Sequence, residues 1–289
     1  MRQSTPPISA NLCDIPVGDA APVRIMAIVN VSPESFYNKS VSQNLEQIAE
    51  TAHMFVTEGA DIIDVGAMST APYNKTQISS AEETDRLVRS IDAIKKKVSV
   101  PVSADTTRAV PAKAALNSGA QIINDVTGLK NDPEMATVIA DAAASVVLVA
   151  NDGSLKSDAP SEGIANALWE SLEIAGLAGI PKRRIVIDPG IGFFRGPGIR
   201  WPEWDYRAIR EIDRLRPLGL PILVGASRKS FIGEVLKQPN PADRLIGSLG
   251  CAALAAEKGA HILRTHDPKE TLEIVKIVEA IQGRTRTST

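Results

Sequence analysis

The strongest constraint on the fold is a repeated alternation of short Val/Ile-rich runs with longer amphipathic stretches. Continuous apolar runs bounded by Gly, Pro and polar residues are typical of parallel strands that are buried on both faces. The predicted strands are Val23–Asn30, Ala60–Gly66, Val100–Thr106, Ala120–Val126, Ala144–Ala150, Ile185–Gly190, Pro221–Ser227 and Ala260–His266. The predicted helices lie near residues 44–58, 81–97, 109–118, 132–142, 162–179, 204–216, 241–258 and 268–281.

The order of these elements predicts the fold class. Strict alternation of eight strands with eight helices implies a parallel sheet with helical crossovers. Eight repeats favour a single-domain α/β protein with a TIM (β/α)8 barrel, and an open doubly wound sheet is the alternative. We expect the barrel at residues 23–282, an irregular N-terminal extension at 1–22 and a loose C-terminal tail at 283–289.

The ends of the predicted helices carry residue types that commonly start or end helices. Four glycines each follow a predicted helix and directly or closely precede a strand, as expected of glycines that end helices: Gly59, Gly119, Gly179 and Gly259. Asp267 and Pro268 open the last helix, with Asp267 as the predicted N-cap.

Composition and charge narrow the classes of partner. The chain has 289 residues, of which 44% are hydrophobic, as is ordinary for a globular domain. Its formal net charge of −2 gives no electrostatic reason to expect binding to nucleic acid or to an anionic membrane. Cys13 and Cys251 lie far apart and outside any metal-ligand spacing. The N-terminus does not match a secretory signal, and no apolar run is long enough to span a bilayer, so we expect a cytoplasmic protein.

Polar residues gather where the predicted strands end. In a barrel of parallel strands, functional groups belong at the carboxyl ends of the strands and in the loops that follow. A single Asp or Asn there is also explained by capping of the next helix. Asp105, Asn124 and Asp188, however, lie in runs too apolar to solvate them, so they need partners. A ligand rich in N–H groups would supply those partners.

Cationic groups cluster late in the chain. Lys229 lies in a Ser-Arg-Lys run after the seventh strand, and Arg264 and His266 lie two residues apart at the end of the eighth. These positions are where such barrels often bind phosphate, and arginine presents a planar fork to phosphate oxygens. A structural ion pair with a neighbouring Asp is the alternative.

A series of motifs lies at successive strand ends, which are Ile25–Phe36, Ala60–Gly66, Asp105-Thr106, Ile122–Gly128, Asp188–Phe193, Gly225–Gly233 and Arg264–Asp267. Through these motifs the chain resembles the dihydropteroate synthase family of pterin-binding barrels over Ile25 to Ile281. Each motif alone is a weak signal, but together and in this order they are specific. The resemblance implies condensation of 6-hydroxymethyl-7,8-dihydropterin pyrophosphate with an arylamine such as p-aminobenzoate, with release of pyrophosphate, in folate synthesis.

The resemblance also implies roles for individual residues. The pterin would be bound by Asp105, Asn124, Asp188, Phe193 and Lys229, and the pyrophosphate by Asn30, Arg264 and His266. Lys229, Arg264 and His266 would be the catalytic residues. Asn30 would also lie near a Mg²⁺ ion, which favours oxygen ligands and substrate phosphates.

The second-substrate region would include Ser32, Pro33, Thr70 and Ser227. Here the chain departs from the family. Ala71 stands where the family has the arginine of its Glu-Ser-Thr-Arg-Pro motif, and residues 149–152 replace a Met-His pair.

These departures leave alternatives open. The arylamine could be a ribosylated aminobenzene phosphate of tetrahydromethanopterin synthesis. A pterin-dependent methyltransferase and a non-catalytic pterin-binding paralogue are further readings. Family members commonly form homodimers through late helices, and the Ala-rich segment Leu249–Ala256 is a candidate for that contact.

Overall fold

The structure is a computed structural model that describes residues 7–31, 45–68, 78–151, 159–194 and 199–283. Within these residues, eight parallel strands form one sheet in the order β8-β7-β6-β5-β4-β3-β10-β9. The strands are β3 (Arg24–Asn30), β4 (Ile62–Gly66), β5 (Val102–Asp105), β6 (Ile122–Asp125), β7 (Ser145–Val149), β8 (Ile185–Asp188), β9 (Leu223–Val224) and β10 (Ile262–Thr265). A parallel bridge between Ile187 and Ile222 joins the two edges, so the sheet is a nearly closed barrel, and the predicted TIM barrel is confirmed.

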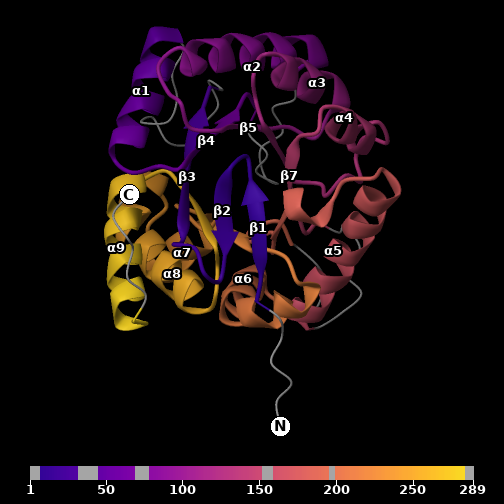
Figure 1. Cartoon of the computed structure of the whole chain (residues 1–289). Helices are drawn as coiled ribbons and strands as arrows, with labels where there is room; N and C mark the ends of the chain where they lie inside the picture. Colours follow the sequence, from indigo (N-terminus) through magenta and orange to yellow (C-terminus); the bar gives the residue numbers. More distant parts are fainter. Residues whose placement is uncertain (1–6, 32–44, 69–77, 152–158, 195–198, 284–289) are drawn as a thin grey trace.

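Helices surround the strands as a ring (Figure 1). The α-helices are α1 (Leu45–Thr57), α2 (Ser80–Lys95), α3 (Ala109–Asn117), α4 (Met135–Asp141), α5 (Pro160–Leu177), α6 (Trp201–Arg210), α7 (Ser230–Leu236), α8 (Leu245–Glu257) and α9 (Pro268–Ile281). Short 3-10 helices are η2 (Lys182–Arg184), η3 (Ile212–Leu218) and η4 (Pro241–Arg244). None of the helices in the described residues is long and apolar enough to cross a membrane.

The helix boundaries follow local chemistry at several ends. The Ser79 side chain accepts a hydrogen bond from the Glu82 backbone N–H at 3.1 Å and caps α2. The four glycines predicted to end helices all adopt positive φ, between 80° and 100°. Asp267 precedes α9 as predicted, but its side chain makes no capping hydrogen bond. That carboxylate instead pairs with Arg228, as described below.

The N-terminal segment corrects one expectation. Residues 1–22 were predicted to be irregular, but β1 (Ser9–Leu12) and β2 (Ile15–Gly18) form an antiparallel hairpin. Its two turn residues, Cys13 and Asp14, have φ of 53° and 67°, as a two-residue hairpin turn of this kind requires. Residues 284–289 of the predicted tail lie outside the described residues.

The hairpin closes one end of the barrel. Leu12 and Val17 are buried against apolar side chains that point into the barrel from seven of its eight strands, which are Met26, Ile62, Ile122, Val147, Val186, Leu223 and Ile262. Figure 1 shows the hairpin lying across the centre of the ring of helices. Below the strands' carboxyl ends, the barrel interior is therefore a packed apolar layer, as is usual in this fold.

Candidate active site

A polar layer lies directly above that apolar layer. Side chains on a strand alternate between its faces, so residues two apart point the same way. Four strands place a polar residue two positions after an inward apolar one. The pairs are Ile62 and Asp64, Ile122 and Asn124, Val186 and Asp188, and Ile262 and Arg264. The sequence thus delivers these four side chains to the interior of the barrel at its carboxyl end.

Arg264 lies at the centre of this layer. Its Nε lies 2.7 Å and its Nη2 2.6 Å from Asp64 Oδ2, and Nη2 also lies 2.8 Å from Asp105 Oδ2. Asn124 Nδ2 donates to the same oxygen of Asp64 at 3.2 Å. Side chains from β4, β5, β6 and β10 therefore form one hydrogen-bonded group, which adds Asp105 of β5 to the polar layer.

Asp64 is a site residue that the sequence prediction left out. Its side chain is fully buried, and it accepts hydrogen bonds from two other members of the layer. A carboxylate inside the apolar run Ile62–Val65 was the available signal, because a buried charge requires partners. Asp64 holds Arg264 and Asn124 in position.

Three oxygen atoms of the layer have no hydrogen-bond partner among the described residues. They are Asp64 Oδ1, Asp105 Oδ1 and Asn124 Oδ1, and each is inaccessible to solvent. Buried polar atoms without a partner are rare in folded proteins and call for an explanation. Three acceptors on neighbouring strands suit a ligand that presents several N–H donors.

Burial sets the protonation of two of these acids. It raises the pKa of Asp105 to about 7, although the nearby Arg264 guanidinium acts to lower it. Burial also raises the pKa of Asp188, which Lys229 and the Gly190 backbone N–H act to lower. Asp188 Oδ1 accepts that N–H at 2.7 Å. The Asp105 carboxyl can therefore gain or lose a proton near neutrality.

Lys229 lies across the loop that follows β8. Its Nζ donates to the Ile191 carbonyl oxygen and lies 4.7 Å from the centre of the Phe193 ring. A Cβ on Gly192 would be 2.9 Å from Lys229 Cδ, so glycine is needed for this close approach. Lys229 and Phe193, both predicted site residues, are thus brought together.

His266 and Ser227 form a second pair at this end of the barrel. The two side chains meet at 3.0 Å between Ser227 Oγ and His266 Nδ1, and the His266 backbone N–H donates to the same Oγ at 3.3 Å. Burial, with Arg264, Arg228 and Lys229 nearby, lowers the pKa of His266 to about 3. The imidazole is therefore neutral at physiological pH.

Asn30 ends β3 beside Gly66 and the polar layer. A Cβ on Gly66 would lie 3.2 Å from Asn30 Oδ1 and 3.8 Å from Asp105 Oδ2, so the absence of a side chain there lets both approach. No group of three or more His, Cys, Asp or Glu side chains suited to a metal occurs in the described part of the chain. The predicted residues Ser32, Pro33 and Thr70 lie outside the described residues.

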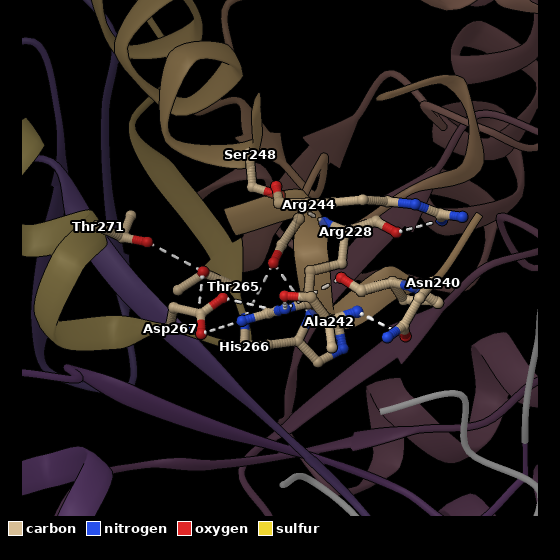
Figure 2. A network of polar contacts seen from close by, with 11 residues as sticks. Arg228, Asn240, Ala242, Arg244, Ser248, Thr265, His266, Asp267 and Thr271 are labelled. Carbon is tan, nitrogen blue, oxygen red and sulfur yellow. Dashed lines mark hydrogen bonds and ion pairs between the residues drawn. The ribbon is translucent and has the colours of Figure 1, made fainter. Parts of the chain in front are cut away.

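Arg228 has a different role from its neighbours. The sequence grouped it with the cations of the phosphate region, but its guanidinium forms a buried ion pair with Asp267, with Nε–Oδ2 at 2.9 Å and Nη2–Oδ1 at 2.6 Å (Figure 2). The alternative of a structural ion pair, weighed for the late cations, therefore applies to Arg228, and Arg264 likewise forms ion pairs with Asp64 and Asp105. The partners are 39 positions apart, so sequence spacing alone did not reveal them.

The sequence and the architecture match known proteins. The family model for pterin binding enzymes matches residues 26–266. The dihydropteroate synthase of Escherichia coli K12 is 35% identical over 269 residues, which cover 91% of this chain and 93% of the relative. The chain belongs to the dihydropteroate synthase family.

Solved structures of the family agree with this assignment. A Yersinia pestis dihydropteroate synthase in complex with a sulfonamide drug superposes with a TM-score of 0.86 at 32% identity, covering 96% of this chain and 99% of that one. The Xanthomonas albilineans enzyme with 4-aminobenzoic acid superposes with a TM-score of 0.84 at 31% identity, covering 96% and 100%. The predicted function, a condensing transferase of folate synthesis, is confirmed by these relatives, and they do not favour the alternatives.

Proposed function

We propose that the polar layer binds the pterin ring of 6-hydroxymethyl-7,8-dihydropterin pyrophosphate and that the acceptor is p-aminobenzoate. The observation that carries this proposal is that Asp105 and Asn124 each have a buried oxygen that lacks a hydrogen-bond partner among the described residues. A pterin edge presents a flat array of N–H groups that matches such acceptors. The relative crystallised with 4-aminobenzoic acid supports the choice of arylamine.

The pterin contacts follow from chemistry and position. Asp105, Asn124 and Asp188 accept the N–H groups of the ring, and Phe193 provides an apolar surface beside it. Lys229 donates to the carbonyl side of the pterin, because its ammonium group is close to the Phe193 ring and near enough to Asp188 to act on its pKa. In this arrangement Asp64 contacts Arg264 and Asn124 and holds both in place.

The leaving group is held at the neighbouring cationic side. The bond between the pterin methylene carbon and the pyrophosphate oxygen breaks, and negative charge grows on the pyrophosphate. Arg264 binds Asp64 and Asp105 through Nε and Nη2, so it stabilises that charge through its positive charge and through Nη1, and neutral His266 adds a hydrogen-bond donor. The methylene carbon becomes part of a delocalised cation, and the arylamine nitrogen bonds to it. The resulting arylammonium is acidic and gives its proton to solvent or to the released pyrophosphate, so a strong general base is not required.

A Mg²⁺ ion fits this scheme with few protein ligands. Asn30 Oδ1 is an oxygen donor at the end of β3, and substrate phosphates supply most ligands of Mg²⁺ in such sites. When bound, Mg²⁺ would neutralise charge on the pyrophosphate. Ser227, beside His266, is the described member of the second-substrate region.

Calorimetry and pyrophosphate release test this function. Asp105→Ala and Lys229→Ala should each sharply weaken binding of the pterin pyrophosphate while circular dichroism stays unchanged. Unchanged binding in both variants would refute the pocket. Pyrophosphate release should require Mg²⁺ and p-aminobenzoate, and release only with the ribosyl phosphate of the aminobenzene would refute the proposed acceptor.

We also propose that two copies associate through an apolar face on α8 and α9. Ile246 and Leu254 on α8 are 82% and 57% exposed, and Ile277 and Ile281 on α9 are 60% and 81% exposed. Large apolar side chains that recur at helical spacing on two packed helices mark an interaction surface. Light scattering should show a dimer that Ile246→Glu converts to a monomer, and a monomeric parent protein would refute the proposal.

The cytoplasmic location of the protein stays a prediction.

A further inference from the structure

Arg228 adopts an unusual backbone conformation between two site residues. Its φ is +57°, in the left-handed region that residues other than glycine rarely occupy. Ser227 precedes it and Lys229 follows it, so its backbone sets the directions of both side chains. Strained backbone of this kind persists only where surrounding contacts determine it, and it is concentrated at functional sites.

Two residues of the α8 region hold the backbone of Arg228 from both sides. The Arg228 N–H donates to Ser248 Oγ at 2.8 Å, and Ser248 Oγ in turn donates to the Arg244 carbonyl oxygen at 2.7 Å. Arg244 Nη1 donates to the Arg228 carbonyl oxygen at 3.0 Å. The three residues therefore form a closed circuit of hydrogen bonds (Figure 2).

The side chain of Arg228 is fixed as firmly as its backbone. Besides its ion pair with Asp267, Nη1 donates to the carbonyl oxygens of Pro241 and Ala242 at 3.0 and 2.7 Å. Asp267 directly follows His266, so the same network also holds the loop after β10. Ser227 and His266 thus approach each other from two loops that Arg228 joins.

The Arg244 guanidinium is held by contacts with the end of α7 and the segment that follows it. Its Nε donates to the Gln238 carbonyl oxygen at 2.9 Å, and a Cβ on Gly233 would lie 2.5 Å from that Nε. The guanidinium thus passes closely over a glycine of α7 to reach the Arg228 carbonyl. A lysine has one ammonium group and could not form this fork of contacts.

We propose that Ser248 and Arg244 are positioning residues of the transferase. They hold Arg228 in its left-handed conformation, so that Lys229 reaches the Ile191 carbonyl and Ser227 reaches His266. The inference rests on the roles proposed above for Lys229, Ser227 and His266. It adds residues of α8 and the segment before it, which contact no substrate, to the groups on which binding and turnover depend.

Loss of the Ser248 hydroxyl should release the Arg228 N–H. The backbone can then relax toward an ordinary conformation, which would turn Ser227 and Lys229 away from their partners. Small displacements of this kind lower turnover by roughly 10- to 100-fold in enzymes. Both substrates should be affected, because Lys229 is assigned to the pterin and Ser227 to the arylamine.

Ser248→Ala can be compared with a matched variant on another helix. Ser171 is buried on α5, and its Oγ donates to the Ala167 carbonyl at 3.1 Å, four residues earlier, as Ser248 does to Arg244. Ser171→Ala therefore removes an equivalent hydroxyl, which packs beside Gly128 in the loop after β6 and whose hydrogen bond stays within α5, away from Arg228 and its neighbours. We expect Ser248→Ala to lower kcat/KM for both substrates by about tenfold or more, and Ser171→Ala to leave it within about twofold.

A second measurement reports on position independently of turnover. The chain contains three histidines, so nitrogen NMR can resolve the ring of His266. In Ser248→Ala the Nδ1 resonance of His266 should move as its Ser227 contact changes, and in Ser171→Ala it should stay in place. Unchanged kinetics together with an unchanged His266 resonance in Ser248→Ala would overturn the inference.

Arg244→Lys provides the second variant for the same circuit. It should reproduce the fall in kcat/KM for both substrates and the shift of the His266 resonance, and a parental resonance and parental kinetics would count against the role of Arg244. Failure of this inference and failure of the proposed function give different experimental results. If the parent protein does not release pyrophosphate with p-aminobenzoate, the proposed function fails, whereas the resonance of His266 still tests the positioning network.

Discussion

Asp105 Oδ2 accepts a hydrogen bond from Arg264 Nη2 at 2.8 Å, yet burial keeps the pKa of Asp105 at about 7. A pocket that pairs a cation with a carboxyl group poised near neutrality responds to any ligand that favours one form of that carboxyl. An N–H donor favours the ionised form and lowers the pKa. The acid and its arginine thus link ligand binding to proton release.

Pterin binding should therefore tighten as pH rises. The unliganded Asp105 loses its proton around pH 7, and the bound ring selects the carboxylate, so affinity should increase between about pH 6 and 8. Calorimetry in buffers of different ionisation enthalpy should detect proton release at pH 6.5. Asp105→Asn should bind weakly and without this pH dependence, and proton release that persists in Asp105→Asn would refute the assignment.

His266 should not titrate in the physiological range. Burial and three nearby cations lower its pKa to about 3, from an ordinary value of 6.5. Because the unfolded chain takes up this proton more readily, His266 contributes stability that is present above pH 6.5 and is lost as pH falls toward 3. An NMR titration should show His266 unchanged from pH 8 to 5, and a midpoint near 6 would contradict its neutral role.

Gly192→Ala should displace Lys229. Gly192 has a φ of +88°, and a Cβ there would lie 2.9 Å from Lys229 Cδ. Gly179→Ala is a matched control, because its φ is +80° but a Cβ there would meet nothing within 4 Å. Both variants should lose about 1–2 kcal/mol of stability to backbone strain. Weaker pterin binding is expected only for Gly192→Ala, and equal binding in the two variants would refute the contact.

Asp19→Ala should destabilise the protein without changing the site. Asp19 accepts hydrogen bonds from Arg216 Nη1 and Nη2 at 2.9 and 2.8 Å and from the Ile8 backbone N–H at 2.8 Å, and it lies 3.2 Å from His261 Nε2. Loss of these charge-assisted bonds should cost about 1–3 kcal/mol, visible as a lower Tm. Pterin affinity should be unchanged, because these contacts hold the N-terminal segment at the opposite end of the barrel.

The same carboxylate has a pH signature. The Arg216 guanidinium holds the pKa of Asp19 well below its ordinary value of 3.8. The resulting stability is present above pH 3.8 and is lost as pH falls further, so the Tm difference between parent and Asp19→Ala should shrink in acid. Glu50→Ala, which removes an exposed partner of Lys97, should leave the Tm nearly unchanged. A constant Tm difference down to pH 2 would contradict the role of Asp19.

The repeat of strands and helices was predictable because burial on both faces leaves an unbroken apolar pattern. The strand predicted at Ile185–Gly190 is β8, for example, and its ending Asp188 points inward as expected. The hairpin Ser9–Gly18 was missed because it is short, mixes polar and apolar residues and is stabilised by packing on the barrel. Helix α7 was missed because it follows the Ser-Arg-Lys motif directly and spans only Ser230–Leu236.

In the site, too, some features could be predicted from the sequence and others could not. The position of five residues at the carboxyl end of the barrel was predictable, because each is a polar residue at the end of an apolar strand or in the loop that follows: Asp105, Asn124, Asp188, Lys229 and Arg264. Their roles stay predictions. The partners of Arg228 were not, since Asp267 and Ser248 reach it only after two loops and a helix have packed. Pairing across such separations depends on tertiary structure, which local pattern does not encode.

The hairpin at the base of the barrel has a practical consequence. Its contacts hold Ser9–Gly18 at the face opposite the carboxyl ends of the strands. A reporter domain, an affinity handle or a solid support joined directly ahead of this hairpin would therefore attach at the closed face. Immobilised enzyme attached in this way should retain unobstructed access for pterin and arylamine.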